Sequence, residues 1–422
     1  MKILLVSTYE LGHQPLGVAG PAGMLQERGH EVRCLDLSVQ EWDGALVNWA
    51  DRVAISVPMH TAARLARSIA PKFEVPVAAY GLYAAMCAEV ATALVDRDPE
   101  TALLRWIEED LLAEHVRALP ARNLLPPLTS YARLVLADSE LPTAYVEAST
   151  GCAHRCKHCP VPVVYDGRTR IVSVDAIVED VVAQKNAGAR HVTFGDPDFF
   201  NGIHHALRVA RAVHEAAPDM TFDCTVKVEH ILRHEEVWGE MSGLGCLFVV
   251  SAFESVNDTI LERLDKGHTA KDGQQAVAVL RDHGITVRPT WLPFTPWSDL
   301  QDVQEITNFV ADNDLISNVD PVHYSIRLLV PQGSLLIGEI DGLMPFDPER
   351  LSHPWHSPLD PLQKRLATIV ETMTDNPVSE TFDAVRVELG LEPVNAPDVS
   401  VPHLSEPWFC CAEPTEAQFT TF

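Results

Sequence analysis

The sequence predicts an α/β protein with a Rossmann-like N-terminal domain, a partial β/α barrel and a short C-terminal extension. The chain has 422 residues, which is enough for two or three domains. Short apolar runs alternate with segments of helical periodicity, a pattern typical of parallel sheets covered by helices. A proline-rich link with Pro120, Pro126 and Pro127 separates an early group of these units from a later group. The expected domains are residues 1–125, 135–335 and 336–422.

Four apolar runs predict the sheet of the first domain. The expected strands are residues 3–6, 32–37, 53–57 and 77–80. Residues 18–28 and 62–73 lie between them and have the apolar spacing of helices. The loop at residues 12–17 follows the first strand, where open α/β sheets bind ligands. It lacks GxGxxG, so the sequence does not favour a dinucleotide.

The alternation becomes more regular from about residue 140 to 330. The expected strands are residues 144–148, 191–194, 221–228, 246–253, 286–292 and 322–329. The expected helices are residues 174–187, 203–216, 235–242, 272–282 and 300–310. Six β–α units predict a partial (β/α)6 barrel or a strongly curved parallel sheet, with the ligand site at the C-terminal strand ends. The extension has frequent prolines and one expected helix, residues 362–374.

Charge and hydropathy disfavour several classes of partner. With 32 Lys and Arg against 59 Asp and Glu, the net charge is −27. Such an acidic surface repels phosphate backbones and anionic membranes, so we expect neither a nucleic acid nor a membrane as partner. No apolar stretch is long enough for a membrane span, and the first eight residues are too short for a secretory signal. We therefore expect a cytoplasmic protein whose thiols stay reduced.

Three of the nine cysteines stand in the pattern CxxxCxxC, directly after the first strand of the second domain. They are Cys152, Cys156 and Cys159. Three thiolates on a short loop can hold a [4Fe–4S] cluster and leave one iron free for a chelating ligand. Alternatively, His154 or His158 could complete a zinc site. Structural zinc sites favour paired CxxC motifs, and the sequence has no second pair, so the spacing favours the cluster.

The cysteine loop and further motifs resemble the radical S-adenosylmethionine (SAM) superfamily over about residues 140–330. Phe-Gly-Asp-Pro at 194–197 is similar to the family's Gly-Gly-Glu-Pro, which holds the SAM amino group, although Phe194 replaces a glycine and Asp196 is shorter than glutamate. Ala-Phe-Glu-Ser at 252–255 resembles the Gly-Ile-Glu-Ser motif near the SAM ribose. The run at 260–269 resembles that of corrinoid-type members. The resemblance implies a radical SAM transferase.

This resemblance implies a set of cofactors and contacts. The cofactors are a [4Fe–4S] cluster and SAM, with an external one-electron reductant as partner. SAM carries a carboxylate, so a buried cation is expected to face it, with Arg327 as the first choice and Arg288 as the second. For each arginine, a salt bridge is the alternative. The implied SAM-binding residues are His158, Gly195, Asp196, Lys227, Glu254, Ser255, Arg288 and Arg327.

The first domain resembles the cobalamin-binding-like Rossmann domain that often precedes such barrels. The usual motif for the lower axial ligand of cobalt, Asp-x-His-x-x-Gly, is absent. His13 and His60 are the nearby histidines on suitable loops, and neither has that sequence setting. We therefore do not expect cobalamin, and we prefer a structural or dimerising role for this domain.

Adjacent cysteines near the C-terminus form a second candidate site. Cys410 and Cys411 seldom suit a disulfide with each other, but together they offer a soft bidentate ligand. The alternative is that a tail of mixed composition happens to contain both. The segment at 406–414, Glu-Pro-Trp-Phe-Cys-Cys-Ala-Glu-Pro, resembles the radical SAM group named for its CCAEP end, in which some relatives have selenocysteine at the first position.

The tail resemblance implies a chemistry. One enzyme type of that group serves arsinothricin biosynthesis and moves the 3-amino-3-carboxypropyl group of SAM onto trivalent arsenic. Cys410 and Cys411 would hold arsenite as the small-molecule substrate, and Glu413 could accept a proton. A radical SAM methylase, or a 5′-deoxyadenosyl-radical enzyme that modifies a peptide or natural product, is the alternative; a non-catalytic metal- or metalloid-binding protein is a further one. The cysteines predicted to be core residues are Cys34, Cys87, Cys224 and Cys246.

Overall fold

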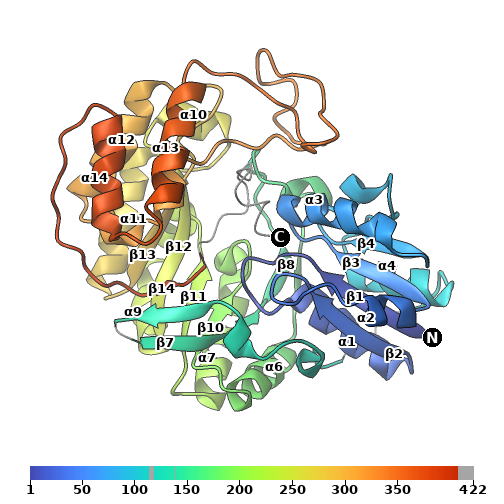
Figure 1. The fold of residues 1–422 in the computed structure, drawn as a ribbon. Helices are drawn as coiled ribbons and strands as arrows, with labels where there is room; N and C mark the ends of the chain where they lie inside the picture. The colour runs from blue at the N-terminus through green and yellow to red at the C-terminus, as the bar shows by residue number, and fades with distance from the viewer. Residues whose placement is uncertain (114–117, 138, 407–422) are drawn as a thin grey trace.

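A five-stranded parallel sheet forms the N-terminal part of the protein, shown at the right of Figure 1. The computed structural model describes residues 1–113, 118–137 and 139–406. The strand order is β2-β1-β3-β4-β5. The strands are β1 (Lys2–Ser7), β2 (Glu31–Asp36), β3 (Arg52–Ser56), β4 (Val77–Tyr80) and β5 (Thr92–Leu94). The helices are α1 (Leu16–Glu27), α2 (Gly44–Trp49), α3 (His60–Ile69) and α4 (Pro99–Glu108). The four predicted strands are confirmed, and β5 was not predicted.

Strand β1 shows why this sheet is covered on both faces. Ile3, Leu4, Leu5 and Val6 are all completely buried, as expected for a central parallel strand. Because successive side chains point to opposite faces, Ile3 and Leu5 pack with α1 and α4, whereas Leu4 and Val6 pack with α3. The uninterrupted apolar run in the sequence follows from this double coverage.

A seven-stranded sheet with the order β13-β12-β11-β10-β7-β6-β14 forms the second part. Its parallel strands are β7 (Ser139–Val146), β10 (His191–Phe194), β11 (Thr221–Thr225), β12 (Cys246–Glu254) and β13 (Thr286–Trp291). The antiparallel edge strands are β6 (Arg133–Leu136) and β14 (His403–Leu404). A separate two-stranded ribbon contains β8 (Ser149–Gly151) and β9 (Thr169–Ile171). The predicted partial barrel is confirmed as an open, curved sheet.

Helices cover the outer face of the second sheet and continue into the C-terminal region (Figure 1). They are α6 (Val174–Asn186), α7 (Ile203–Ala216), α8 (Val228–Arg233), α9 (Trp238–Gly243), α10 (Asp258–Arg263), α11 (Ala270–Asp282), α12 (Leu300–Asp312), α13 (Asp360–Thr372) and α14 (Val378–Glu388). Short α5 (Val161–Tyr165) follows the cysteine loop. Among the described residues, no helix combines the length and the apolar character that crossing a membrane requires.

Two expected strands of the barrel differ from prediction. The expected sixth strand, residues 322–329, is replaced by the 3-10 turn η8 (Pro321–Tyr324) and a single bridge between Phe294 and Arg327. Its apolar side chains, including Leu328, pack in a small core cluster with Trp355 rather than along a strand ladder. The expected strand 221–228 ends at Thr225, because α8 begins three residues later.

The C-terminal extension contacts both sheets. Its last strand, β14, pairs with β6 of the second sheet. Leu351 packs in the core of the first sheet, and its carbonyl lies 3.3 Å from His60 Nε2. The Tyr9 hydroxyl donates a hydrogen bond of 2.6 Å to Glu406. The extension also contains α14, a helix that was not predicted from the sequence; its buried apolar residues are Phe382 and Val385.

Arg122 joins the two sheets through three contacts. Its guanidinium donates to the Gln14 carbonyl at 3.1 Å and to the Tyr145 carbonyl at 2.7 Å. It also forms an ion pair of 2.9 Å with the buried Asp180 on α6. The loop after β1, strand β7 and helix α6 are therefore fixed to one another by one side chain.

Replacing Arg122 with methionine is expected to lower the free energy of unfolding by about 3–5 kcal/mol, because Asp180 loses its cation while it stays buried. Urea unfolding measures the loss. Arg28→Met is the matched control, since the Arg28–Glu108 pair is more exposed and its loss should cost less than about 1 kcal/mol. Equal losses in the two variants would contradict this role for Arg122.

Candidate active site

A cavity of about 530 Å³ lies between the C-terminal strand ends of the two sheets. One wall follows β1, β3 and β4 of the first sheet, and the other follows β7, β10, β11 and β12 of the second. The first wall is mainly apolar, with the residues Leu11, Leu16, Gly17, Met59, Gly81 and Leu82. Both sheets thus place their usual ligand-binding edge on the same space.

The three cysteines of the loop all line the second wall. Cys152 and Cys156 are buried, Cys159 is half-buried, and all three are free thiols. Burial raises the pKa of Cys152 to about 12 and also raises that of Cys156. Thiolates at these positions therefore need a cationic partner, which the iron of a cluster supplies. Three cysteines on one wall fit the donor set of a [4Fe–4S] cluster that keeps one iron open.

Backbone contacts hold the cysteine loop against the barrel. The Lys157 amide donates to the Leu264 carbonyl at 2.9 Å, and the Ala153 amide donates to Asn201 Oδ1 at 3.0 Å. The Lys157 side chain forms an ion pair of 2.8 Å with Glu339 of the C-terminal extension. These contacts tie the loop to three other parts of the chain.

Glu254 stands at the end of β12 beside the loop, in the left-handed backbone region with a φ of 64°. Its Oε1 lies 3.1 Å from His158 Nε2 and 3.2 Å from Lys266 Nζ. Burial alone would raise the pKa of Glu254, but the Lys266 cation and the His158 imidazole hold it well below its usual range. The carboxylate is therefore ionised at the cavity wall. Lys266 was not singled out as a site residue, although it lies in the recognised run at 260–269.

Four of the predicted SAM-binding residues line the cavity, namely His158, Gly195, Lys227 and Glu254. Asp196 and Ser255 are buried outside the lining. Asp196 accepts hydrogen bonds from the Ala148 amide at 2.8 Å and the Ser149 hydroxyl at 2.6 Å, so it fixes the start of the cysteine loop. The Ser255 hydroxyl accepts from the Asn257 amide at 3.0 Å. Both side chains thus form hydrogen bonds with neighbouring protein groups.

The two arginines expected to face the SAM carboxylate also lie outside the cavity lining. Arg327 pairs with Asp360 at 2.6 Å, and its guanidinium stacks 3.5 Å from the centre of the Trp355 ring. Arg288 pairs with Asp320. The salt-bridge alternative therefore describes both arginines in this structure. The lysines among the described lining residues are Lys227 and Lys266. Lys227 already belongs to the predicted SAM-binding set.

Sequence reasoning missed an acidic group on the cavity wall. Glu10 follows β1, and Glu147 follows β7 directly before the cysteine loop. Burial raises the pKa of each carboxyl to about 8. The Tyr145 hydroxyl donates to Glu147 at 3.3 Å. The sequence signal for this group is the position of both carboxylates shortly after strand ends, where α/β sheets bind ligands.

The remaining cysteine predictions divide into two groups. Those predicted to lie in the core are all buried, namely Cys34, Cys87, Cys224 and Cys246. Cys410, Cys411 and Glu413 lie outside the described residues, so their predicted roles stay predictions.

Residues 146–308 match the family model of the radical SAM superfamily. Over this stretch the chain is similar to radical SAM proteins. Hopanoid C-3 methylase of Methylococcus capsulatus is 26% identical to the chain over 188 residues, which cover 44% of this chain and 35% of the methylase. The chain spans less than half the length of the curated relatives it matches. The family match and the methylase-type relatives support an enzyme that transfers a group.

Two solved radical SAM proteins share the fold of both parts. TsrM, a radical SAM methyltransferase from Kitasatospora setae solved with cobalamin and a [4Fe–4S] cluster, is 17% identical, with a TM-score of 0.57 over 74% of this chain and 73% of TsrM. OxsB, a cobalamin-dependent SAM radical enzyme solved with aqua-cobalamin and SAM, is 13% identical, with a TM-score of 0.64 over 89% of this chain and 67% of OxsB.

The expectation that cobalamin is absent is contradicted by these structures, since both proteins of this fold were solved with cobalamin. The expectation rested on a missing motif for the lower axial ligand, together with His13 and His60. His13 stacks on Tyr145 with ring centres 4.4 Å apart, and His60 faces the Leu351 carbonyl. Neither histidine lines the cavity. The absence of Asp-x-His-x-x-Gly excludes a histidine ligand to cobalt from that motif. It does not exclude binding of cobalamin.

Gly195 offers a test of the packing at the cavity wall. A Cβ atom at this position would lie 2.0 Å from the Tyr145 hydroxyl oxygen, which cannot move freely because Tyr145 is packed against His13. Gly195→Ala is therefore expected to destabilise the fold by about 1–3 kcal/mol. Chemical denaturation measures this loss. Gly202→Ala is the control, because its Cβ would meet only the His205 side chain at 3.8 Å; a loss as large in the control would contradict the steric argument.

Proposed function

We propose that the protein is a radical SAM transferase that binds a [4Fe–4S] cluster and cobalamin on opposite walls of its central cavity and transfers a SAM-derived carbon group. One observation carries this proposal. The cavity is continuous from the three cysteines of the loop to the strand ends of the N-terminal sheet. A cofactor on the first wall and SAM on the second would therefore meet in one cavity.

The first wall suits the flat face of a corrin ring. Its side chains are apolar, and glycines at positions 17 and 81 let backbone approach closely. Gly81 has a φ of 106°, which favours glycine, and a Cβ at Gly17 would lie 2.7 Å from the Ser56 hydroxyl. Glu10 on this wall and Glu147 on the facing wall could form hydrogen bonds with amide groups at the edge of such a ring. This wall supports cobalamin held without a histidine ligand from the described residues that line it.

The second wall has the groups that SAM needs. When bound, the cluster and SAM supply a carbon-centred radical, and cobalamin supplies a carrier for an alkyl group. The chain itself holds the cluster through Cys152, Cys156 and Cys159. Lys227 presents an ammonium group to the cavity for the SAM carboxylate, and the ionised Glu254 presents an acceptor for ribose or amino groups.

For the group and its acceptor, we propose transfer of 3-amino-3-carboxypropyl to trivalent arsenic held by Cys410 and Cys411. The support comes from the sequence Cys-Cys-Ala-Glu-Pro and from the soft, thiophilic character of arsenite. The described part of the chain ends at Glu406, which accepts a hydrogen bond from the Tyr9 hydroxyl. Tyr9 directly precedes Glu10, which lines the cavity. Cleavage of the Cγ–S bond of SAM would leave methylthioadenosine.

Methyl transfer is the second candidate function. It is favoured by the similarity to hopanoid C-3 methylase and by the methyltransferase TsrM among the structures with this fold. The two candidates share the cluster and the cavity and differ in the bond of SAM that breaks. Their products therefore separate them.

Mass spectrometry of an anaerobic reaction tests the proposal. The reconstituted protein is incubated with SAM, reductant and arsenite, with and without cobalamin. Methylthioadenosine and an arsenic adduct that carries the aminocarboxypropyl group support the first function. S-adenosylhomocysteine with a methylated product supports the second, and 5′-deoxyadenosine as sole product contradicts both. A Cys410→Ser/Cys411→Ser variant should lose the arsenic adduct and keep its iron, whereas persistence of the adduct would contradict arsenic binding by the tail.

A further inference from the structure

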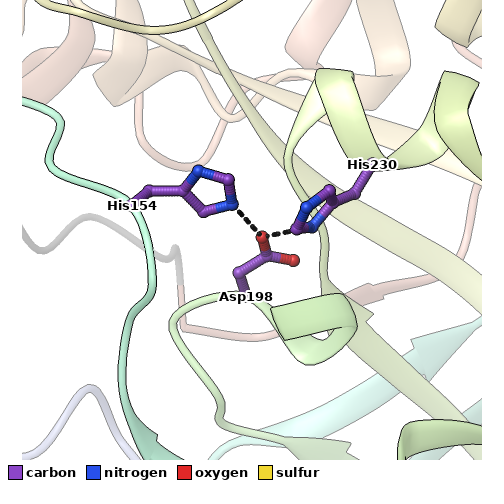
Figure 2. Close-up of side chains that lie close together, drawn as sticks. All are labelled: His154, Asp198 and His230. Carbon is purple, nitrogen blue, oxygen red and sulfur yellow. Dashed lines mark ion pairs between the residues drawn. The ribbon is translucent and has the colours of Figure 1, made fainter. Parts of the chain in front are cut away.

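Two histidines, one of them in the cysteine loop, and an aspartate converge on one point (Figure 2). His154 lies in the loop, between Cys152 and Cys156. Asp198 follows β10 and begins the turn η5 (Phe199–Gly202), and His230 lies on α8. Asp198 Oδ2 is 2.7 Å from His230 Nδ1 and 3.3 Å from His154 Nε2. All three atoms lie within 4.8 Å of one another, so a single ion could reach each of them.

These three atoms are buried and lie against one another. Asp198 uses its other oxygen, Oδ1, to accept from the Phe200 amide at 3.2 Å, which fixes the carboxylate. Within the described part of the chain, none of His154 Nε2, Asp198 Oδ2 and His230 Nδ1 has a hydrogen-bond partner of suitable geometry. The Asp198 side chain is fully buried, and those of His230 and His154 are 7% and 18% exposed. Buried polar atoms that meet only one another, in ion pairs without suitable hydrogen-bond geometry, have the arrangement that a bound metal ion would satisfy.

We propose that His154, Asp198 and His230 bind a divalent first-row transition-metal ion, separate from the iron–sulfur cluster. Two imidazoles and one carboxylate are the ligand set of non-haem Fe(II) sites and of three-ligand Zn(II) sites with an open position. The proposal does not depend on the proposed transfer reaction. Asp198 would supply a negative charge to the ion, and the two imidazoles would bind it in their neutral form.

A further carboxylate supports the orientation of one ligand. Glu229 Oε2 lies 4.0 Å from His154 Nδ1, the ring nitrogen that faces away from Asp198. Glu229 is itself held by Lys227 at 3.5 Å and by Arg233 on the next turn of α8. A carboxylate next to the second nitrogen of a ligating histidine is the usual arrangement at metal sites, where it fixes the ring and increases its basicity.

The ion would tie together three segments that are far apart in the sequence, namely the cysteine loop, the end of β10 and helix α8. His154 stands between two of the cluster cysteines, so the ion would restrain the loop that holds the cluster. His154 also lines the central cavity, whereas Asp198 and His230 do not. An open coordination position would therefore face the cavity past His154, within reach of a small ligand.

Cobalt binding to a thiol-depleted full-length chain tests the site directly. The variant Cys152→Ser/Cys156→Ser/Cys159→Ser/Cys410→Ser/Cys411→Ser removes the competing thiols of both motifs. We expect one equivalent of Co²⁺ with the visible spectrum of nitrogen and oxygen ligands and no sulfur-to-cobalt charge-transfer band. Adding His230→Ala or Asp198→Asn should weaken binding by more than about 100-fold, and Glu229→Gln by about 10-fold. Unchanged affinity in His230→Ala and Asp198→Asn would overturn the proposal.

His234→Ala is the matched control, since this histidine lies 5.9 Å from the His230 ring and outside the three ligands. Its affinity for Co²⁺ should equal that of the parent. A second measurement uses the holoenzyme, which does not depend on the folding of the cysteine variant. After reconstitution and desalting in the presence of Zn²⁺, we expect one zinc in addition to about four iron per chain. Asp198→Asn should lose the zinc and keep the iron; holoenzyme without zinc would overturn the proposal.

Discussion

Cys156→Ala is expected to lose the iron–sulfur cluster and to reduce SAM cleavage to background. A [4Fe–4S] cluster in this loop depends on three thiolates, and no other described cysteine lines the cavity to replace the lost one. Cys156 is buried next to Lys266 and Lys227, whose charges favour its thiolate. Iron analysis of the reconstituted protein should fall from about four per chain to below one.

Cys87→Ala provides the control for this prediction. Cys87 is buried in the core of the first sheet, with its Sγ 3.9 Å from the Ala63 carbonyl, and it does not line the cavity. This variant should keep its iron and its SAM cleavage. If Cys156→Ala retained full iron and cleavage, the cluster would have to lie elsewhere in the chain.

Lys266→Met is expected to lower the free energy of unfolding by about 3–5 kcal/mol. Lys266 and Glu254 form a buried ion pair of 3.2 Å, and the lysine is only 3% exposed. Removing the cation leaves the Glu254 carboxylate buried with His158 as its remaining partner. Losing one partner of a buried pair is costly because the other charge stays desolvated. Urea unfolding of the cluster-free chain measures the change.

A double variant distinguishes loss of the ion pair from loss of packing. Glu254→Gln/Lys266→Met removes both charges and should recover most of the stability that Lys266→Met loses. Lys157→Met is the exposed control, because its pair with Glu339 is about one-third to two-fifths exposed and should contribute less than about 1 kcal/mol. If the double variant were as unstable as Lys266→Met, packing of the lysine stem would explain the loss.

Local patterns predicted the sheets well because their strands are buried on both faces. Residues 3–6 and 191–194 read as strands for this reason, and the structure places both at sheet centres. Residues 322–329 are equally apolar but fill a satellite cluster rather than a strand ladder. An apolar run predicts that a segment is buried, but it does not predict whether a neighbouring strand is available to pair with it. The sequence therefore could not distinguish residues 322–329 from the true strands.

The candidate site differs from the prediction where side chains contact residues distant in the sequence. The cysteines could be placed from spacing alone, because a cluster loop is local. Arg288 and Arg327 were expected to face SAM, but Asp320 and Asp360 neutralise them from segments more than thirty residues away. Likewise, Asp198 and His230 come from two further strand–helix units, so no short motif announces the site they form with His154. Contacts of this kind are decided by the fold.

The shared cavity couples ligand binding to the association of the two sheets. Since its walls come from both, a ligand that fills it binds well only while the sheets are held as Arg122 holds them. By thermodynamic linkage, a ligand at one hundred times its dissociation constant adds about 2.7 kcal/mol to the stability of that closed arrangement. A bound cofactor would therefore stabilise the association of the two sheets. Loss of the cofactor would make the interface between the sheets more accessible to proteases.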